Sequence, residues 1–135
     1  MSILAIDYGE KRIGLAIGEI GGLAQTLKVL SNSEKVVNKL GEICKEENIK
    51  KILIGLPLDS KGKIGFAAKG VQAFTGKLSR EVQLPIEFVD ESLTSREALS
   101  HTIRAGKKRK DRKNLDSISA AIILQEYLDN YTLKD

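Results

Sequence analysis

The chain has 135 residues, of which 41% are apolar and 30% charged, and its formal net charge is +4. This length predicts one domain over residues 1–135, large enough to bury a core without disulfides or a structural metal. The one cysteine, Cys44, excludes an intramolecular disulfide and fits a reducing compartment. No apolar run approaches the roughly 20 residues that cross a bilayer, and the first residues lack a secretory pattern. We therefore expect a cytoplasmic protein that makes no membrane contact.

The first thirty residues predict strands. Residues 2–8 and 12–18 are short β-branched runs on either side of a polar turn that contains Gly9, a pattern typical of a hairpin. A weaker third strand follows at residues 24–30. The first run is the more continuously apolar of the opening pair, which favours a central strand buried on both faces.

Helices and strands alternate after residue 30. Residues 33–47 carry apolar side chains at helical spacing, and Cys44 falls on that stripe as a small core residue. Residues 51–55 predict a strand, residues 66–79 a helix and residues 85–90 a further strand. Such alternation favours parallel pairing, whereas the opening hairpin is antiparallel. The predicted fold is α/β, with a mixed five-stranded sheet and helices on both faces.

The last third of the chain predicts two helices joined by a basic loop. Thr94 to Glu97 match a capping box that opens a helix to about residue 104, and Gly106 stops it. The last helix should begin near Asn114 or Asp116 and reach about residue 130. Its expected inward side chains are Leu115, Ile118, Ala121, Ile122 and Leu128.

Three carboxylates are expected to meet at one edge of this sheet. Parallel strands bind ligands outside their carboxyl ends, and the predicted strands end at Asp7, at residues 55–57 and at Asp90-Glu91. The last helix could present Asp116 to the same edge. Clustered carboxylates repel one another unless a cation holds them together, and oxygen ligands select Mg²⁺ or Mn²⁺. Two such ions suit the in-line hydrolysis of a phosphodiester.

Each acid also has a purely structural interpretation. Asp7 could close the hairpin turn together with Gly9. Glu91 could be an exposed acid ahead of a helix, and Asp116 an ordinary acid in the first turn of a helix, where negative charge is favoured.

Other residues compete for the same roles. Asp90 would replace Glu91 if the strand register shifted by one residue, and Asp111 and Glu19 are further candidate ligands. The one histidine, His101, fits a surface or half-buried helical position better than a general base.

Positive charge is concentrated in residues 104–113, which contain seven basic residues and one acid. The net charge of this segment is +6, whereas that of the whole chain is +4, so the charges of all the other residues sum to −2. We expect it to contact a polyanion, although a solubilising loop would look the same. The candidate nucleic-acid-binding residues here are Arg104, Lys107, Lys108, Arg109, Lys110, Arg112 and Lys113.

Four blocks of the chain resemble the YqgF family, which is described as Holliday junction resolvases or as nucleases that mature the small-subunit ribosomal RNA precursor. The blocks are IDYGEKRIGLAIG (6–18), GLPLDSKGK (55–63), FVDESLTSREA (88–98) and KDRKNLDSISAAIILQEYL (110–128). Their order and spacing run through nearly the whole chain. The resemblance implies an RNase H-like fold with one catalytic acid in each of three blocks.

Carried onto this sequence, the implied catalytic and metal-binding acids are Asp7, Glu91 and Asp116, the same three that the topology favours. The resemblance also implies that Lys11 and Arg12 face the substrate phosphates.

The chain departs from the family pattern in three places. Gly18-Glu19 stands where Ser-Asp is common, Ser92 where an arginine often follows the Asp-Glu pair, and residues 59–65 replace a DGSEG-like stretch. None of these departures removes an expected metal ligand.

The sequence thus predicts a Mg²⁺- or Mn²⁺-dependent endonuclease that acts on structured RNA or branched DNA. Maturation of the 5′ end of the small-subunit rRNA precursor is the favoured role. Holliday junction resolution is the alternative, and the chain could act as a monomer or a homodimer. A nucleic-acid-binding module without catalysis would use the same basic segment. An actin-like or sugar-kinase ATPase is disfavoured, because 135 residues cannot supply its two domains.

Overall fold

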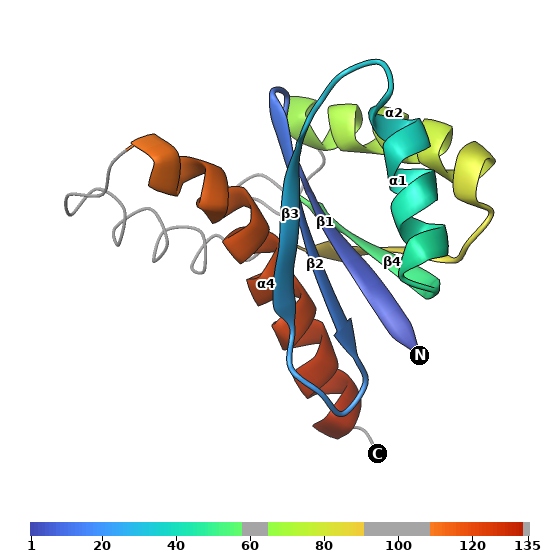
Figure 1. Ribbon diagram of the computed structural model, residues 1–135, viewed down its shortest axis with the longest axis vertical. Helices are drawn as coiled ribbons and strands as arrows, with labels where there is room; N and C mark the ends of the chain where they lie inside the picture. The colour runs from blue at the N-terminus through green and yellow to red at the C-terminus, as the bar shows by residue number, and fades with distance from the viewer. Residues whose placement is uncertain (58–64, 91–108, 134–135) are drawn as a thin grey trace.

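The computed structural model describes residues 1–57, 65–90 and 109–133 (Figure 1). Within these residues, five strands form one mixed sheet in the order β3-β2-β1-β4-β5. Strand β2 pairs antiparallel with both β1 and β3, and β4 pairs parallel with both β1 and β5. The strands are β1 (Ser2–Tyr8), β2 (Arg12–Glu19), β3 (Gln25–Ser31), β4 (Ile49–Leu56) and β5 (Ile86–Asp90). The helices are α1 (Val36–Glu46), α2 (Phe66–Val82) and α4 (Arg109–Leu133).

The predicted hairpin and central strand are confirmed. Strand β1 lies in the middle of the sheet, and its residues 3–7 are all buried. The turn from β1 to β2 requires Gly9, because a Cβ there would lie 2.5 Å from the carbonyl oxygen of Arg12. Asn32, which follows β3, braces this turn: its backbone N–H donates to Lys11 O at 2.9 Å, and its side-chain Nδ2 donates to Gly9 O at 2.8 Å.

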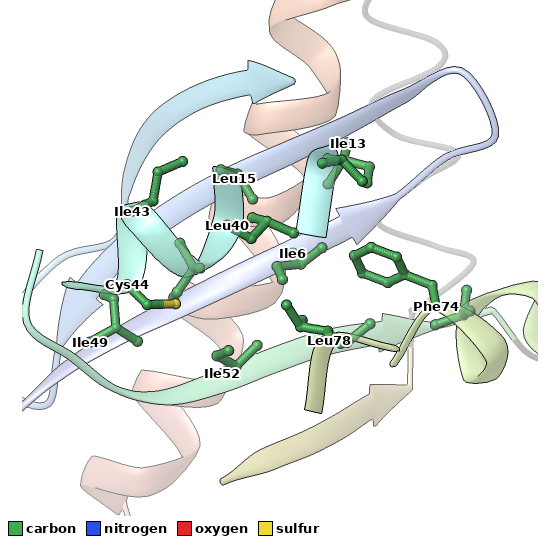
Figure 2. Packing of buried hydrophobic residues seen from close by; sticks show 14 residues of the cluster. Ile6, Ile13, Leu15, Leu40, Ile43, Cys44, Ile49, Ile52, Phe74 and Leu78 are labelled. Atoms are coloured by element: carbon green, nitrogen blue, oxygen red, sulfur yellow. The ribbon is translucent and has the colours of Figure 1, made fainter. Parts of the chain in front are cut away.

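Helices cover both faces of the sheet, as predicted. Figure 1 shows α1 and α2 on one side and α4 on the other. Figure 2 shows the core beneath α1 and α2, where Leu40, Cys44, Phe74 and Leu78 pack over Ile6 and its neighbours on the sheet. Cys44 is therefore a small core residue, as its place on the apolar stripe of α1 predicted.

The second core lies under α4 and is smaller and richer in alanine. Its buried members are Ile3, Ala5, Ala16, Leu53, Ala120, Leu124 and Leu128. On β1 the odd-numbered residues 3 and 5 belong to this core, whereas the even-numbered 4 and 6 belong to the other. This alternation fixes which face of the sheet each later residue of the strand occupies.

Two predictions about the last helix were wrong. The helix begins at Arg109, so residues 109–113 are helical and are not part of a loop. Lysine and arginine are good helix formers, and no glycine or proline follows Gly106 in this part of the chain to stop the helix. Ile118 was expected to face inward, but its side chain is 37% exposed, whereas Ser117 is buried. The helix predicted over residues 94–104, together with His101, lies outside the described residues.

None of the helices in the described part of the chain combines the length and the apolar character needed to cross a membrane.

Candidate active site

Asp7 lies at the carboxyl end of the central strand with only 5% of its surface exposed. Strand alternation places it on the same face as Ile3 and Ala5, beneath α4. A carboxylate at this depth is costly unless polar or charged groups compensate for its lost hydration. Its interpretation as a turn residue that closes the hairpin with Gly9 is wrong, because Asp7 is a paired residue within β1.

Both strands beside Asp7 present glycine at the same level. Gly14 of β2 is its direct antiparallel partner, and the parallel register of β1 with β4, Ile6 opposite Ile54, brings Gly55 next to it. Glycine within a strand often marks a place where a ligand approaches the backbone closely. The residue directly beside this carboxylate is thus glycine on both adjacent strands.

The carboxyl ends of β1, β4 and β5 lie at one edge of the sheet. Gly55, which lies next to Asp7, pairs with Val89, and Leu56 pairs with Asp90. The last residue of β5, Asp90, is therefore one residue further along the sheet than Asp7. With strands about 4.8 Å apart, β1 and β5 are separated by about 10 Å. That separation suits two carboxylates that share one or two cations between them.

Asp90 lies on the wrong face to join Asp7. Glu87 and Val89 of β5 contact residues on the α4 side, whereas Ile86 packs into the core under α1 and α2. Alternation then places Asp90 on the α1 and α2 side. The one-residue register shift that would bring Asp90 to the site is therefore absent, and Asp90 is exposed.

Glu91 lies outside the described residues, and of Asp116 the structure describes only the backbone within α4. Asp116 is seven residues beyond the start of α4, so its interpretation as a first-turn helix acid is wrong. Its backbone position precedes buried Ser117 by one residue and buried Ala120 by four. Of the further candidate ligand Asp111, the structure describes only the helical backbone. Glu19 lies at the end of β2 away from Asp7, where it accepts a hydrogen bond from Ser2 Oγ.

Packing on β2 fixes the position of α4. A Cβ added to Gly18 would lie 3.2 Å from Leu124 Cδ2, 3.2 Å from Leu128 Cδ1 and 3.3 Å from Ala24 Cα. Glycine at position 18, where the family pattern commonly has serine, thus lets α4 rest closely on the sheet. The backbone N–H of Ala24 also donates to Gln125 Oε1 at 2.8 Å.

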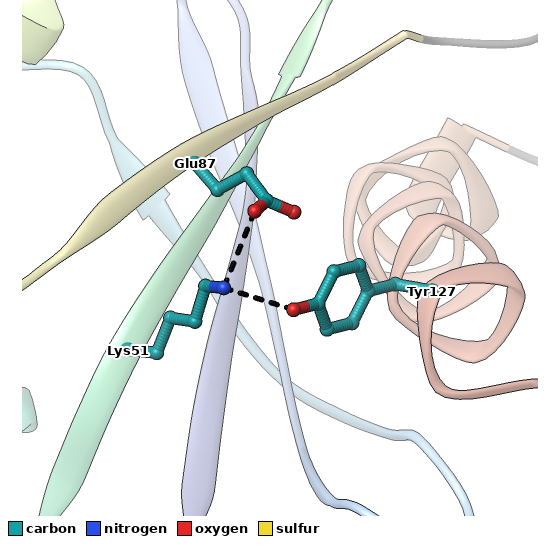
Figure 3. Close-up of polar contacts among 3 residues, drawn as sticks. All are labelled: Lys51, Glu87 and Tyr127. Atoms are coloured by element: carbon teal, nitrogen blue, oxygen red, sulfur yellow. Dashed lines mark hydrogen bonds and ion pairs between the residues drawn. The ribbon is translucent and has the colours of Figure 1, made fainter. Parts of the chain in front are cut away.

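A polar cluster ties the other side of α4 to β4 and β5. Lys51 Nζ donates to Tyr127 Oη at 2.9 Å and to Glu87 Oε1 at 3.3 Å, as Figure 3 shows. The ammonium group also lies 5.2 Å from the centroid of the Tyr127 ring. The hydrogen bond with Tyr127, followed by the contact with Glu87, raises the pKa of Lys51. This cluster fixes α4 across the sheet at the end away from Asp7.

Two of the expected phosphate-binding residues lie at the same edge of the sheet. Lys11 and Arg12 are exposed at the β1–β2 turn, immediately beyond Asp7. The backbones of Arg109, Lys110, Arg112 and Lys113 occupy the first turns of α4. Arg104, Lys107 and Lys108 lie outside the described residues.

No group of three histidine, cysteine or acidic side chains is close enough to hold a metal within the side chains that the structure describes. Ser117 and Asn32 were not predicted from the sequence. The many apolar residues of α4 did not indicate which face of the helix is buried, so the burial of Ser117 was not expected. Asn32 stands in an Asn-Ser pair of the kind found in turns, and that pair could have indicated its role.

The family model for RuvX, described as Holliday junction resolvase, matches residues 1–130. The chain belongs to the RuvX family. This RuvX chain is 41% identical over 137 residues to a protein of Dictyoglomus turgidum, covering 98% of this chain and 97% of the relative. A relative from Syntrophomonas wolfei is 39% identical over 137 residues, covering 98% and 97%. Both relatives are named "Putative pre-16S rRNA nuclease".

Solved structures confirm the RNase H-like fold of this RuvX chain. Thermus thermophilus RuvC in complex with a Holliday junction substrate superposes with a TM-score of 0.57 at 12% identity, covering 91% of this chain and 92% of RuvC. The fowlpox virus Holliday junction resolvase gives a TM-score of 0.56 at 17% identity, covering 96% and 99%. Family and relatives together identify the RuvX chain as a nuclease, a hydrolase of a family that generally depends on divalent metal.

Proposed function

We propose that this chain is a Mg²⁺- or Mn²⁺-dependent endonuclease that matures the 5′ end of the small-subunit rRNA precursor in the cytoplasm. Its metal ligands and catalytic residues would be Asp7, Glu91 and Asp116. The observation that carries the proposal is the placement of Asp7. It is a carboxylate only 5% exposed at the carboxyl end of the central strand, with glycine on both neighbouring strands.

The alternation of β5 supports Glu91 as the second ligand. Val89 shares the α4 face with Asp7, and Asp90 does not. A residue two positions after Val89 returns to the Asp7 face if the strand geometry continues, and that residue is Glu91. The third acid, Asp116, would come from α4, the helix that packs on that face.

The oxygen-only donor set fits Mg²⁺ or Mn²⁺ better than zinc, because it contains no histidine or cysteine. When bound, such ions would supply an activated water and charge stabilisation at the leaving oxygen. The chain's own part is to hold the acids at fixed positions. Asp7 is fixed by its pairing within the sheet, and the backbone of Asp116 by the packing of Leu124 and Leu128 on Gly18.

Substrate binding would rest on the phosphate backbone. Residues 104–113 carry a net charge of +6, and Lys11 lies exposed beside Asp7. Contacts of this kind position a nucleic acid without reading its bases. Their strength falls as the salt concentration rises, because the release of counterions that accompanies binding becomes less favourable.

The decisive experiment compares Asp7→Asn with Asp90→Asn. Both substitutions remove one negative charge at the same edge, but only Asp7 is on the α4 face. Using purified protein with Mg²⁺ and a transcript that spans the 5′ end of the small-subunit rRNA, we expect Asp7→Asn to lose cleavage by at least about a thousandfold. The Asp90→Asn variant should stay within about threefold of the parent. If Asp7→Asn cleaves like the parent, or if both variants are equally inactive, the site assignment is wrong.

Holliday junction resolution is a second candidate, because the family model carries that description and RuvC shares the fold. Resolvases cut two symmetry-related strands and need two active sites, which predicts a homodimer on the junction. Cleavage of a synthetic four-way junction should be measured beside cleavage of the rRNA transcript. Faster cleavage of the junction, with a dimer in sedimentation experiments, would favour the second function over the first.

A further inference from the structure

A cavity of about 560 Å³ lies at the carboxyl edge of the sheet, on the face opposite to Asp7. Tyr8 and Glu10 line it from the β1–β2 turn, Pro57 lines it from the end of β4, and Lys69 and Gly70 line it from α2. Small-molecule sites in proteins are clefts of about 300–1,000 Å³, lined mostly by apolar groups with a few polar ones. The cavity is therefore large enough for a nucleotide.

An aromatic ring in a fixed position forms part of the wall. The ring of Tyr8 lies against that of Phe74, with centroids 4.7 Å apart and planes inclined by 37°. Phe74 is only 6% exposed, so it supports the Tyr8 ring from the core side. Aromatic rings held in this way serve as stacking surfaces for unpaired bases, whatever the base sequence.

The charged groups of the cavity match the remainder of a nucleotide. Lys69 is exposed on α2 and offers a cation to a phosphate. Glu10 offers carboxylate oxygens, which accept hydrogen bonds from the exocyclic amino group of a base. The cavity thus offers Tyr8 to the base ring of a nucleotide, Glu10 to its amino group and Lys69 to its phosphate.

Gly70 keeps the α2 side of the cavity open. A Cβ added to Gly70 would meet no atom within 4 Å, so packing does not require glycine there. Glycine inside a helix is less favourable than alanine, but at this position it leaves space beside Lys69. Gly76, further along α2, also has open space around a built Cβ but does not line the cavity, which makes it a matched control.

We propose that this cavity holds one unpaired nucleotide of the substrate strand, with its base against Tyr8 and its phosphate near Lys69. Asp7 and Tyr8 are consecutive residues of β1 that face opposite sides of the sheet. A strand that crosses this edge would place one nucleotide in the cavity and a neighbouring phosphodiester at Asp7. The identity of the occupant as substrate rests on the proposed nuclease function.

The first experiment titrates the metal-free protein, in EDTA, with 5′-AMP while amide chemical shifts are followed by NMR. Saturable shifts are expected at Tyr8, Gly9 and Gly70. Ribose 5-phosphate should bind at least about fivefold more weakly, because base–aromatic stacking is lost. Tyr8→Phe should bind AMP like the parent, whereas Tyr8→Leu should bind it at least about fivefold more weakly. Equal binding of AMP and ribose 5-phosphate, or shifts located elsewhere, would overturn the assignment.

The second experiment compares Gly70→Leu, which fills the cavity, with Gly76→Leu, which does not. Gly70→Leu should lose the AMP shifts and lower kcat/KM on a single-stranded RNA oligonucleotide by about tenfold, while its Tm stays close to that of Gly76→Leu. If Gly70→Leu loses AMP but cleaves at the parent rate, the cavity takes free nucleotides and the substrate assignment fails. AMP binding is measured without metal, so a failure of the nuclease function would not alter that result.

Discussion

The contact between Gly18 and α4 predicts a specific energetic coupling. Leu124 is fully buried, and its Cδ2 would lie 3.2 Å from a Cβ at position 18. Truncating a buried leucine to alanine costs about 2–5 kcal/mol, so we expect Leu124→Ala to lose about 3 kcal/mol and about 10 °C in Tm. Gly18→Ala should cost about 1 kcal/mol, because overpacking outweighs the lower entropy of its unfolded state.

The double variant should be less destabilised than the sum of the two changes. In Leu124→Ala, one of the three close neighbours of the new methyl group at position 18 is gone, and the methyl fills part of the vacated space. We expect a favourable coupling of about 1 kcal/mol, within the range known for residues in contact.

The measurement is guanidinium chloride unfolding of the parent, the two single variants and the double variant in EDTA. Additivity within about 0.3 kcal/mol would show that α4 does not rest on Gly18. A loss below about 1 kcal/mol for Leu124→Ala would contradict its burial against the sheet. Either result would remove the argument that this packing fixes the position of Asp116.

Three further predictions concern charge and burial. The pKa of Lys51 is raised above its ordinary 10.5, mainly by the hydrogen bond with Tyr127, so its stabilising contribution is complete below that pH and is lost as pH rises through the raised value. Lys51→Met should therefore destabilise the protein in urea melts at pH 8, by less than about 1 kcal/mol, and by a smaller amount at pH 11.5. Burial raises the pKa of the Cys44 thiol, so at pH 8 a thiol reagent should label the folded protein at least about tenfold more slowly than free cysteine, and equal rates would contradict its burial. Replacing both Arg109 and Lys110 with glutamine should reduce the slope of log binding constant against log salt by about 1.5 if both contact phosphates, and an unchanged slope would exclude those contacts.

The strands and the position of Asp7 could be predicted from the sequence because the signals are local. The β-branched runs around Gly9 predict a hairpin, and the unbroken apolar character of residues 3–6 predicts a strand covered on both faces. The bounds of β1 matched those predicted, and Asp7 lies at the expected edge because chain direction alone determines where parallel strands end.

The fold class and the family could thus be determined from the sequence by itself, through hydrophobic periodicity and four spaced motifs. The tertiary structure alone decided two features of the site. It placed Asp90 on the face away from Asp7, because strand parity depends on pairing with β4. It also selected Ser117 over Ile118 as the buried residue of α4, because a helix segment rich in apolar residues has no preferred face until it packs against a sheet.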